Sequence, residues 1–396
     1  MTRRLPARLE LLAFGFLATL ASGFGQTYFV GLFGGQWRAD FDLSNAALGT
    51  IYSAATLVSG LTMVEAGRWL DRAPLRGFTA VVVLAFAVAC GLIAVAPVAW
   101  MLFPGLLLLR LCGQGLMGHI AITTVARHAT TARGRSLSIA QLGFPVGEAV
   151  LPGLVVAALA LGSWRAVWWA CAVVLVAVVL PALMRLGRGV SSTGSASDDS
   201  EPGASRRDVV RDRRFHRILP VVLAPPFVVT GLFFHQAAIA EGMGWPLSLL
   251  ATAFLAYAGT QVGGGLLGGW VIDRWTARRT VRFVLVPMAL GLASLATDDA
   301  PVVAFVYMAL MGLSAGAGST VAGALWVELY GRRHLGAIRA MQHAVMVVST
   351  AASPVLFGAA IDAGLEVPHL GLLLAGGAVL AMLGVGRVAP SAHGAA

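Results

Sequence analysis

The stretch "GRWLDRAPLR", residues 67–76, places three arginines and an aspartate in a chain that is 58% hydrophobic. A second stretch, "GWVIDRWTARR", residues 269–279, repeats its Gly-x-x-x-Asp-Arg core, and the two aspartates lie 202 positions apart. Pro152 and Pro354 have the same spacing. Charged and structural residues that recur at one interval indicate that the two halves of the chain repeat each other.

Between the charged segments, the composition predicts helices that cross a membrane. The 396 residues have a mean hydropathy of +0.82 and only 12% are charged, against about 25% in soluble domains. Apolar runs of about 20 residues recur along the whole length. We expect an all-α membrane protein with twelve transmembrane helices in two pseudo-symmetric six-helix bundles. The predicted parts are a bundle over residues 1–186, a Ser/Gly-rich and charged linker over 187–214, and a bundle over 215–396.

Arginine placement predicts the orientation of these spans. All 28 basic residues are arginines, and nearly all of them lie at one end of the predicted spans. Arg38 and Arg165 lie at the opposite ends, and Arg110 lies inside a span. By the positive-inside rule we expect a cell-membrane protein with both termini in the cytoplasm. The net charge of +10 then faces an anionic leaflet and is not a nucleic-acid surface.

Several kinds of chemistry are disfavoured by the residues present. Without lysine, the chain has neither a P-loop nor a Schiff-base amine. Cys90, Cys112 and Cys171 fall in apolar runs without a CxxC pair, which favours buried free thiols. The segment "GGGLLG", residues 263–268, matches a dinucleotide-binding pattern but ends a predicted span, where small residues favour helix packing. We expect no enzyme activity, no cofactor and no metal site.

Two charged residues lie deep in predicted spans, where an ionisable group is costly and therefore a functional candidate. Glu148 and Arg110 lie about 18 Å and about 15 Å along the fifth and fourth spans, from a rise of about 1.5 Å per residue. Both positions are near the midplane of a core about 30 Å thick. We expect them to face the central cavity and interact, with Glu148 as the proton-coupling site and Arg110 orienting substrate. The alternative is a static pair that braces the two spans.

Other polar side chains share helical faces and are candidates for lining the substrate cavity. They are Gln26, Gln114, Gln141, Phe144, His235, Gln236, Tyr257, Gln261, Gln342 and His343. Tyr257 and Gln261 are four residues apart and are expected to pair. For each candidate, a hydrogen bond between helices is the alternative explanation. Glu65 and Glu328 lie at span ends, where we expect gate or loop partners.

With these motifs, the chain resembles a member of the major facilitator superfamily over its whole length. The family's loop signature, Gly-x-x-x-Asp-Arg-x-Gly-Arg-Arg, is matched twice, although Pro74 and Thr276 replace its central glycine. The matched residues are Gly67, Asp71, Arg72 and Arg76, and then Gly269, Asp273, Arg274 and Arg278. The family's fourth-span motif is similar to "RLCGQGLMG", residues 110–118. The layout of residues 25–60 is similar to the opening of monocarboxylate and oxalate/formate-type carriers. Those families typically place an arginine or lysine in late spans to hold the carboxylate, whereas residues 218–240, 247–267 and 301–326, in predicted spans 7, 8 and 10, carry no arginine.

The resemblance implies a transport cycle with a cytoplasmic gate. The eight matched loop residues would hold the halves together on that side in one state. Asp71 would then face a helix start, for which "GRRHLGAIR", residues 331–339, is a candidate. We therefore expect a monomer in the lipid bilayer that moves a small organic solute, an organic anion being one candidate, by proton-coupled alternating access. The alternative is a proton-driven efflux pump for hydrophobic drug-like compounds.

Overall fold

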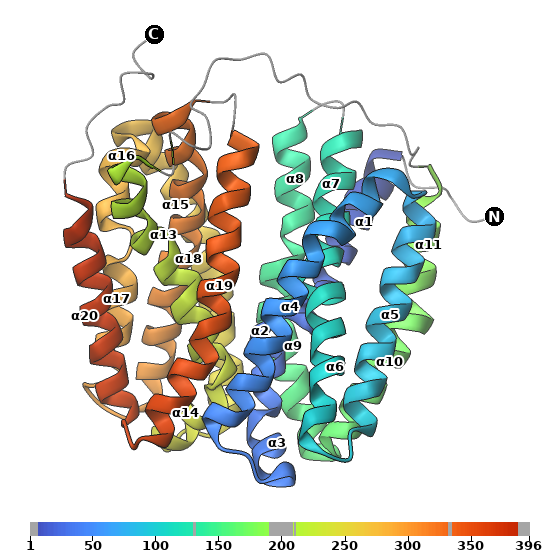
Figure 1. The fold of residues 1–396 in the computed structure, drawn as a ribbon, viewed down its shortest axis with the longest axis horizontal. Helices are drawn as coiled ribbons and strands as arrows, with labels where there is room; N and C mark the ends of the chain where they lie inside the picture. Colours follow the sequence, from blue (N-terminus) through green and yellow to red (C-terminus); the bar gives the residue numbers. More distant parts are fainter. Residues whose placement is uncertain (1–6, 130–131, 190–208, 210, 332–334, 387–396) are drawn as a thin grey trace. The chain divides into compact units, whose positions relative to one another are not determined.

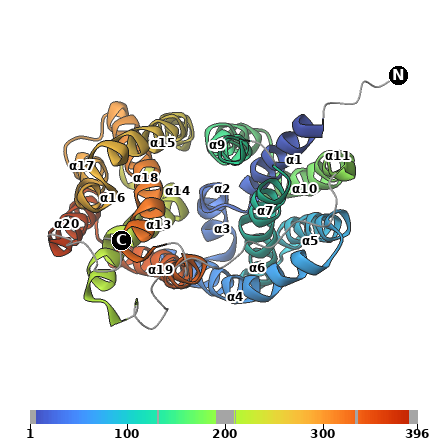
Figure 2. The same cartoon turned by 90° about the horizontal axis from the view of Figure 1, so that it is seen from above.

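The computed structural model describes residues 7–129, 132–189, 209, 211–331 and 335–386. It leaves out the side chains of residues 7, 64, 67–72, 335–337 and 340. The chain divides into two compact units, Met1–Ala196 and Ser197–Ala396, and their boundary lies within the segment predicted as a linker. Figures 1 and 2 show that each unit is a bundle of helices joined by short turns.

The first unit holds the helices up to α11, several of them interrupted by 3-10 or π-helical turns. In chain order these elements are α1 (Ala7–Ala21), η1 (Ser22–Gly25), α2 (Thr27–Val30), η2 (Gly31–Phe33), α3 (Gly34–Phe41), α4 (Asn45–Arg72), α5 (Leu75–Val95), η3 (Ala99–Met101), α6 (Leu102–Leu109), η4 (Arg110–Met117), α7 (Gly118–His128), α8 (Arg133–Gln141), α9 (Gly143–Leu161), α10 (Trp164–Val174), η5 (Leu175–Val179), α11 (Leu180–Leu186) and η6 (Gly187–Gly189).

The second unit holds the helices from α13 onward. They are α13 (Arg213–Phe234), α14 (Gln236–Gly242), α15 (Leu247–Trp275), α16 (Ala277–Thr280), η7 (Val281–Phe283), α17 (Val286–Ser294), α18 (Pro301–Tyr330), α19 (Leu335–Asp362) and α20 (Val367–Val385).

Among the described residues, 11 helical stretches are long and apolar enough to cross a membrane, which confirms an all-α membrane protein. The predicted ninth span, residues 281–297, differs because its helix α17 covers only Val286–Ser294 after a 3-10 turn. The Ser314 hydroxyl donates to the Val284 carbonyl at this interruption, at 2.6 Å. A carbonyl released inside a membrane needs such a partner. With this interrupted segment counted, the layout agrees with the expected twelve.

Close backbone packing joins α15 to α18 in the second unit. Gly312 and Gly316 face the carbonyl oxygens of Tyr257 and Gln261 so closely that any Cβ would collide with them. The segment 263–268 is helical throughout and lies on the same surface, since a Cβ at Gly268 would be 3.1 Å from the Ala317 Cα. Small residues allow helices to approach in this way. The interpretation of "GGGLLG" as a helix-packing segment is therefore confirmed.

A polar cluster at the end of α3 joins three parts of the first unit. Asp40 accepts hydrogen bonds from Trp164 Nε1 at 2.8 Å and from Arg165 Nη1 at 2.9 Å. Arg165 also donates to the Ala96 carbonyl at 3.2 Å. The hydrogen bonds from Trp164 and Arg165 hold the pKa of Asp40 below its usual value. The cluster thus ties α3, the end of α5 and the start of α10 together.

Candidate functional site

The first membrane helix is broken at Gln26. After α1 ends at Ala21 and the 3-10 turn η1 ends at Gly25, Gln26 has extended backbone (φ −80°, ψ 154°), and α2 begins at Thr27. Gly23 and Gly25 favour this interruption because glycine weakens a helix. The break releases backbone groups that must find partners inside the protein.

The fourth helix changes its winding opposite this break. Residues Arg110–Met117 form the π-helix η4 between α6 and α7, and π-helical turns are frequent at functional sites. A Cβ at Gly25 would lie 2.6 Å from the Leu109 carbonyl oxygen and 2.8 Å from the Gly113 Cα. Glycine at both positions therefore lets the two backbones meet.

Arg110 caps the break from the first turn of the π-helix. Its Nη1 donates to the Gly25 carbonyl and to the Thr27 hydroxyl, each at 3.3 Å. Its guanidinium also lies over the Tyr52 ring, 4.9 Å from the centroid, and the Tyr52 hydroxyl is 2.7 Å from Thr27 Oγ1. Arg110 is only 3% exposed, and its Nε–H has no acceptor among the described residues. A buried cation whose Nε–H has no acceptor among the described residues thus joins the first, second and fourth spans.

Thr27 and Tyr52 are parts of this site that sequence reasoning missed. Both side chains are buried, and both belong to apolar runs in which a hydroxyl is inconspicuous. Thr27 is 83 residues from the arginine that it contacts, so no local pattern links them. The signal that marks Thr27 in retrospect is "GFGQT", residues 23–27, where two glycines and a glutamine interrupt an apolar run.

Glu148 interacts with the next residue of the break. Its side chain on α9 is half-buried, and its charge acts on the buried Tyr28 hydroxyl. That hydroxyl fits against two glycines, because a Cβ at Gly23 would lie 2.6 Å from it and a Cβ at Gly147 would lie 2.8 Å from it. Tyr28 therefore connects the break to α9, as Thr27 connects it to Arg110.

Arg110 and Glu148 each interact with the first span. Within the described residues, the hydrogen bonds and the ring contact of Arg110 run to the first two spans. Arg110 is hydrogen-bonded to Thr27, and the charge of Glu148 acts on the next residue, Tyr28. An interaction between the two charges stays a prediction.

The other candidates of the first unit lie near Arg110 or Glu148 in the sequence, but none of them is among the contacts described above for these two residues. Gln26 is half-buried at the break itself, and Gln114 is exposed on the π-helix. Gln141 is exposed as the last residue of α8. Phe144, on α9, packs against α7, since a Cβ at Gly118 would lie 3.3 Å from its Cζ. Their part in a substrate cavity stays a prediction.

The seventh span is interrupted as well, at His235. Helix α13 ends at Phe234 and α14 begins at Gln236. His235 Nε2 lies 2.7 Å from the Pro354 carbonyl oxygen of α19, and because a carbonyl can only accept, Nε2 is the protonated nitrogen. His235 and Gln236 are both buried. Their described environment is thus a helix-to-helix junction within the second unit.

The remaining candidates of the second unit are hydrogen-bonded or exposed. Gln261 donates to the Tyr257 hydroxyl at 3.4 Å, which confirms the expected pair. Gln342 of α19 accepts from Trp326 Nε1 of α18 at 2.7 Å, the helix-to-helix bond that was the alternative for it. His343 is exposed.

The two charged segments end the helices α4 and α15. The side chains of Gly67, Asp71 and Arg72 lie outside the described part of the chain, while Arg76 is exposed at the start of α5. In the second segment Gly269 is half-buried, and Asp273 and Arg274 are exposed near the end of α15.

Glu328 of α18 fastens the second charged segment. Its carboxylate accepts hydrogen bonds from the backbone N–H of Ala277 at 2.7 Å and of Arg278 at 3.2 Å, and it lies 3.5 Å from Arg278 Nε. Thr276 has a φ of +72°, which is strained for a β-branched residue. The carboxylate therefore holds a strained turn, and the expectation that Glu328 is a loop partner is confirmed.

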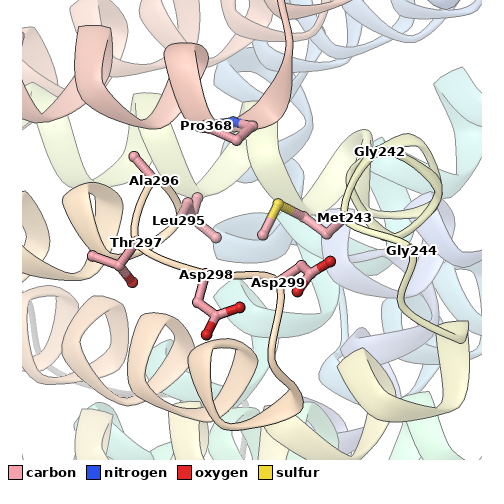
Figure 3. Close-up of a pocket in the computed structure, with 9 residues that line it drawn as sticks. All are labelled: Gly242, Met243, Gly244, Leu295, Ala296, Thr297, Asp298, Asp299 and Pro368. Atoms are coloured by element: carbon pink, nitrogen blue, oxygen red, sulfur yellow. The ribbon is translucent and has the colours of Figure 1, made fainter.

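A pocket of about 360 Å³ lies at the other end of α15. Its lining comes from the turn between α14 and α15, the turn between α17 and α18, and the start of α20. Figure 3 shows Met243 and Leu295 pointing toward each other inside it, with the carboxylates of Asp298 and Asp299 nearby. No predicted site residue lines this pocket, so the break around Arg110 is the stronger candidate.

Comparison with known proteins agrees with this architecture. The model of the Major Facilitator Superfamily matches residues 15–259, more than half of the chain. A comparison with curated protein sequences gives no match.

Solved transporter structures share the fold. A bacterial homologue of the human lysosomal transporter Spinster, solved inward-facing both unoccupied and occupied, has 15% identity and a TM-score of 0.70 in each state, covering 97% of this chain and 94% of that one. A mutant of the nucleoside transporter NupG has 14% identity and a TM-score of 0.75, covering 96% of this chain and 99% of that one. The chain belongs to the Major Facilitator Superfamily and is a multi-pass membrane transporter with that family's fold.

Proposed function

We propose that this protein is a proton-coupled secondary transporter that moves a small organic solute by alternating access, with organic anions as the class that Arg110 favours. The observation that carries the proposal is the broken first span, where a buried cation is hydrogen-bonded to Thr27 and the hydroxyl of the next residue, Tyr28, packs against Gly147, the chain neighbour of Glu148. Discontinuous membrane helices are a common way to build ion and solute sites in secondary transporters.

Arg110 supplies the permanent positive charge for the solute. Its guanidinium keeps its proton in proteins, and its planar fork suits a carboxylate. The Nε–H that has no acceptor among the described residues is available for such a group. Because Arg110 is only 3% exposed, a solute reaches it only when the break moves. Solute binding and movement of the first span are therefore coupled.

Glu148 supplies the proton site. Protonation removes its charge and so changes its interaction with Tyr28. Tyr28 and Thr27 are adjacent in α2, and Thr27 is bonded to Arg110. A proton on Glu148 thus alters the segment that Arg110 holds, and it biases the equilibrium between the transport states.

Three further features complete the proposal. The cycle alternates between states in which the two repeated halves close at opposite ends, and the inward-facing Spinster homologue supports this reading of the fold. The segments 67–76 and 269–279 act as the cytoplasmic gate. The protein works as a monomer in the cell membrane, with its arginine-rich ends and both termini in the cytoplasm.

Uptake into proteoliposomes tests the proposal. Candidate organic anions are offered with and without a pH gradient, and Glu148→Gln is expected to abolish gradient-driven uptake while leaving exchange of labelled for unlabelled solute. Glu241→Gln removes an exposed carboxylate at the end of α14 and should leave both activities unchanged. Gradient-driven uptake that survives in Glu148→Gln contradicts the proton assignment.

The role of Arg110 is tested separately with Arg110→Lys, which keeps the charge and loses the planar fork. The KM is expected to rise about tenfold, the equivalent of about 1.4 kcal/mol. An unchanged KM removes Arg110 from the solute site. Proton-driven export of hydrophobic drug-like compounds, in place of anion uptake, indicates the efflux alternative.

A further inference from the structure

The connector after α15 carries a cluster of arginines at one end of the second unit. Arg274, Arg278, Arg279 and Arg282 fall within residues 274–282. Arg274 and Arg279 are exposed, and the other two are half-buried. Of the four, Arg278 alone has an ion pair within the described residues, with Glu328. The cluster therefore keeps most of its positive charge.

The backbone that carries these arginines is held in place. Ala277 and Val281 are buried, at 0% and 1% exposed, and anchor the connector to the unit. Glu328 holds its first turn through the backbone bonds described above. Arg282, in the 3-10 turn η7 that follows α16, lies three residues after Arg279 and four after Arg278, a spacing at which helical side chains are neighbours.

The connector also lies at a membrane boundary. It begins where the candidate span Leu247–Trp275 ends, and Figure 1 shows α16 at that end of the unit. Three aromatic side chains flank the arginines: Trp270, Trp275 and Phe283 are 61%, 56% and 61% exposed. Exposed tryptophans beside arginines are typical of the level of the lipid headgroups.

Two of the arginines have no counterpart in the repeat. At the spacing of 202 residues, Arg279 and Arg282 correspond to Gly77 and Ala80 in the first unit. They are therefore not part of the signature that both halves share.

We propose that this connector binds the phosphate of an anionic phospholipid, with Arg279 and Arg282 on the headgroup and the flanking aromatic side chains against the lipid body. Guanidinium groups suit phosphate geometry, and clusters of four or more arginines or lysines beside a membrane helix favour anionic lipids. The site is independent of the solute and proton sites proposed above.

Native mass spectrometry of the purified full chain tests this site, with phosphatidylglycerol, phosphatidylcholine and inorganic phosphate titrated separately. Phosphatidylglycerol is expected to bind most tightly. Each arginine near a membrane contributes about 1 kcal/mol, and 1.4 kcal/mol is a tenfold change. Arg279→Gln should therefore weaken binding about fivefold, and Arg279→Gln with Arg282→Gln about thirtyfold.

A matched double variant, Arg185→Gln with Arg188→Gln, removes the same charge at the same spacing from exposed positions of the first unit and should weaken binding less than about threefold. Four results overturn the proposal: unchanged binding in the Arg279 variants, equal weakening in the matched control, phosphatidylcholine binding as tightly as phosphatidylglycerol, or inorganic phosphate binding as tightly as the lipid. Arg279 is exposed, so its single variant keeps the test valid if the double variant folds poorly.

Discussion

The contact between Gly25 and the π-helix makes Gly25→Ala the sharpest perturbation of the candidate site. The new Cβ would lie 2.6 Å from the Leu109 carbonyl oxygen, 2.8 Å from the Gly113 Cα and 3.0 Å from the Gln114 nitrogen, while ordinary contact begins at 3.4 Å. All three neighbours are backbone atoms, so no side-chain rotation relieves the clash. The first and fourth spans have to separate by several tenths of an ångström.

The separation has two costs. Overpacking of this kind costs about 1–3 kcal/mol. The bond from Arg110 to the Gly25 carbonyl is already 3.3 Å long, so moving the spans apart breaks it and costs about 1 kcal/mol more. At about 3 °C per kcal/mol for a unit of this size, we expect the melting temperature to fall by about 6–12 °C.

The three cysteines provide the assay. Cys90, Cys112 and Cys171 are all buried and all lie in the first unit, with Cys112 inside the π-helix. A fluorogenic maleimide reacts with them only when that unit opens. Its reaction on heating therefore reports the melting of the unit that carries the substitution.

Gly153→Ala is the matched control for this prediction. A Cβ at Gly153, which is exposed on α9, meets nothing within 4 Å. Replacing a helical glycine by alanine should stabilise by about 0.5–1 kcal/mol, so this melting temperature should rise slightly. If Gly25→Ala melts like the wild type or like Gly153→Ala, the backbone contact at the break is refuted.

Three further outcomes are expected. Tyr52→Phe keeps the ring beneath Arg110 but loses a buried hydroxyl, so the maleimide melting temperature should fall by the equivalent of about 0.5–1.5 kcal/mol; no change would contradict the bond to Thr27. Hydrogen bonds from Trp164 and Arg165 lower the pKa of Asp40 in the folded protein. At any pH above the unfolded pKa of about 3.9, the ionised carboxylate therefore stabilises the fold. This contribution is lost as the pH falls through the lower pKa of the folded state. Asp40→Asn should therefore be slightly less stable than the wild type, by under about 1 kcal/mol, when melting is followed by tryptophan fluorescence. The difference in stability should be constant from pH 7 to pH 5 and vanish in stronger acid. A difference that disappears by pH 5 would refute the direction of the pKa shift. Glu328→Ala should speed amide hydrogen exchange in residues 276–283 by about two- to thirtyfold, since a lost cap costs about 0.5–2 kcal/mol and 1.4 kcal/mol is a tenfold change. Unchanged exchange would show that the turn does not depend on Glu328.

Sequence reasoning succeeded where the deciding interaction is local or depends on side-chain type alone. Hydropathy predicted the helices because transfer of each apolar side chain into lipid is favourable whatever its neighbours are. The pair of Tyr257 and Gln261 was predictable because residues four apart in a helix share a face. The spacing of the two charged segments indicated the internal repeat, and their match to a known loop signature gave the resemblance to the family before any contact was known.

The partners of Arg110 were beyond such reasoning. Arg110 was identified as a candidate because a charge in a span is conspicuous, yet its partners lie on other spans. Sequence reasoning also did not predict the break at Gln26, the π-helix or the interruption before α17. An apolar run has the same hydropathy whether its helix is continuous or broken.

By itself, the sequence determined that this protein is helical, membrane-embedded, internally repeated and a member of a transporter superfamily. Those properties follow from the chemical type and spacing of residues along one chain. Only the tertiary structure decided that Arg110 caps a broken helix through Gly25 and Thr27, and that Tyr28 of the same break packs against Gly147, the neighbour of Glu148. The reason is physical: which backbone groups a break releases, and which side chains reach them, depends on how closely separate helices pack, and here that closeness is set by glycines on three different spans.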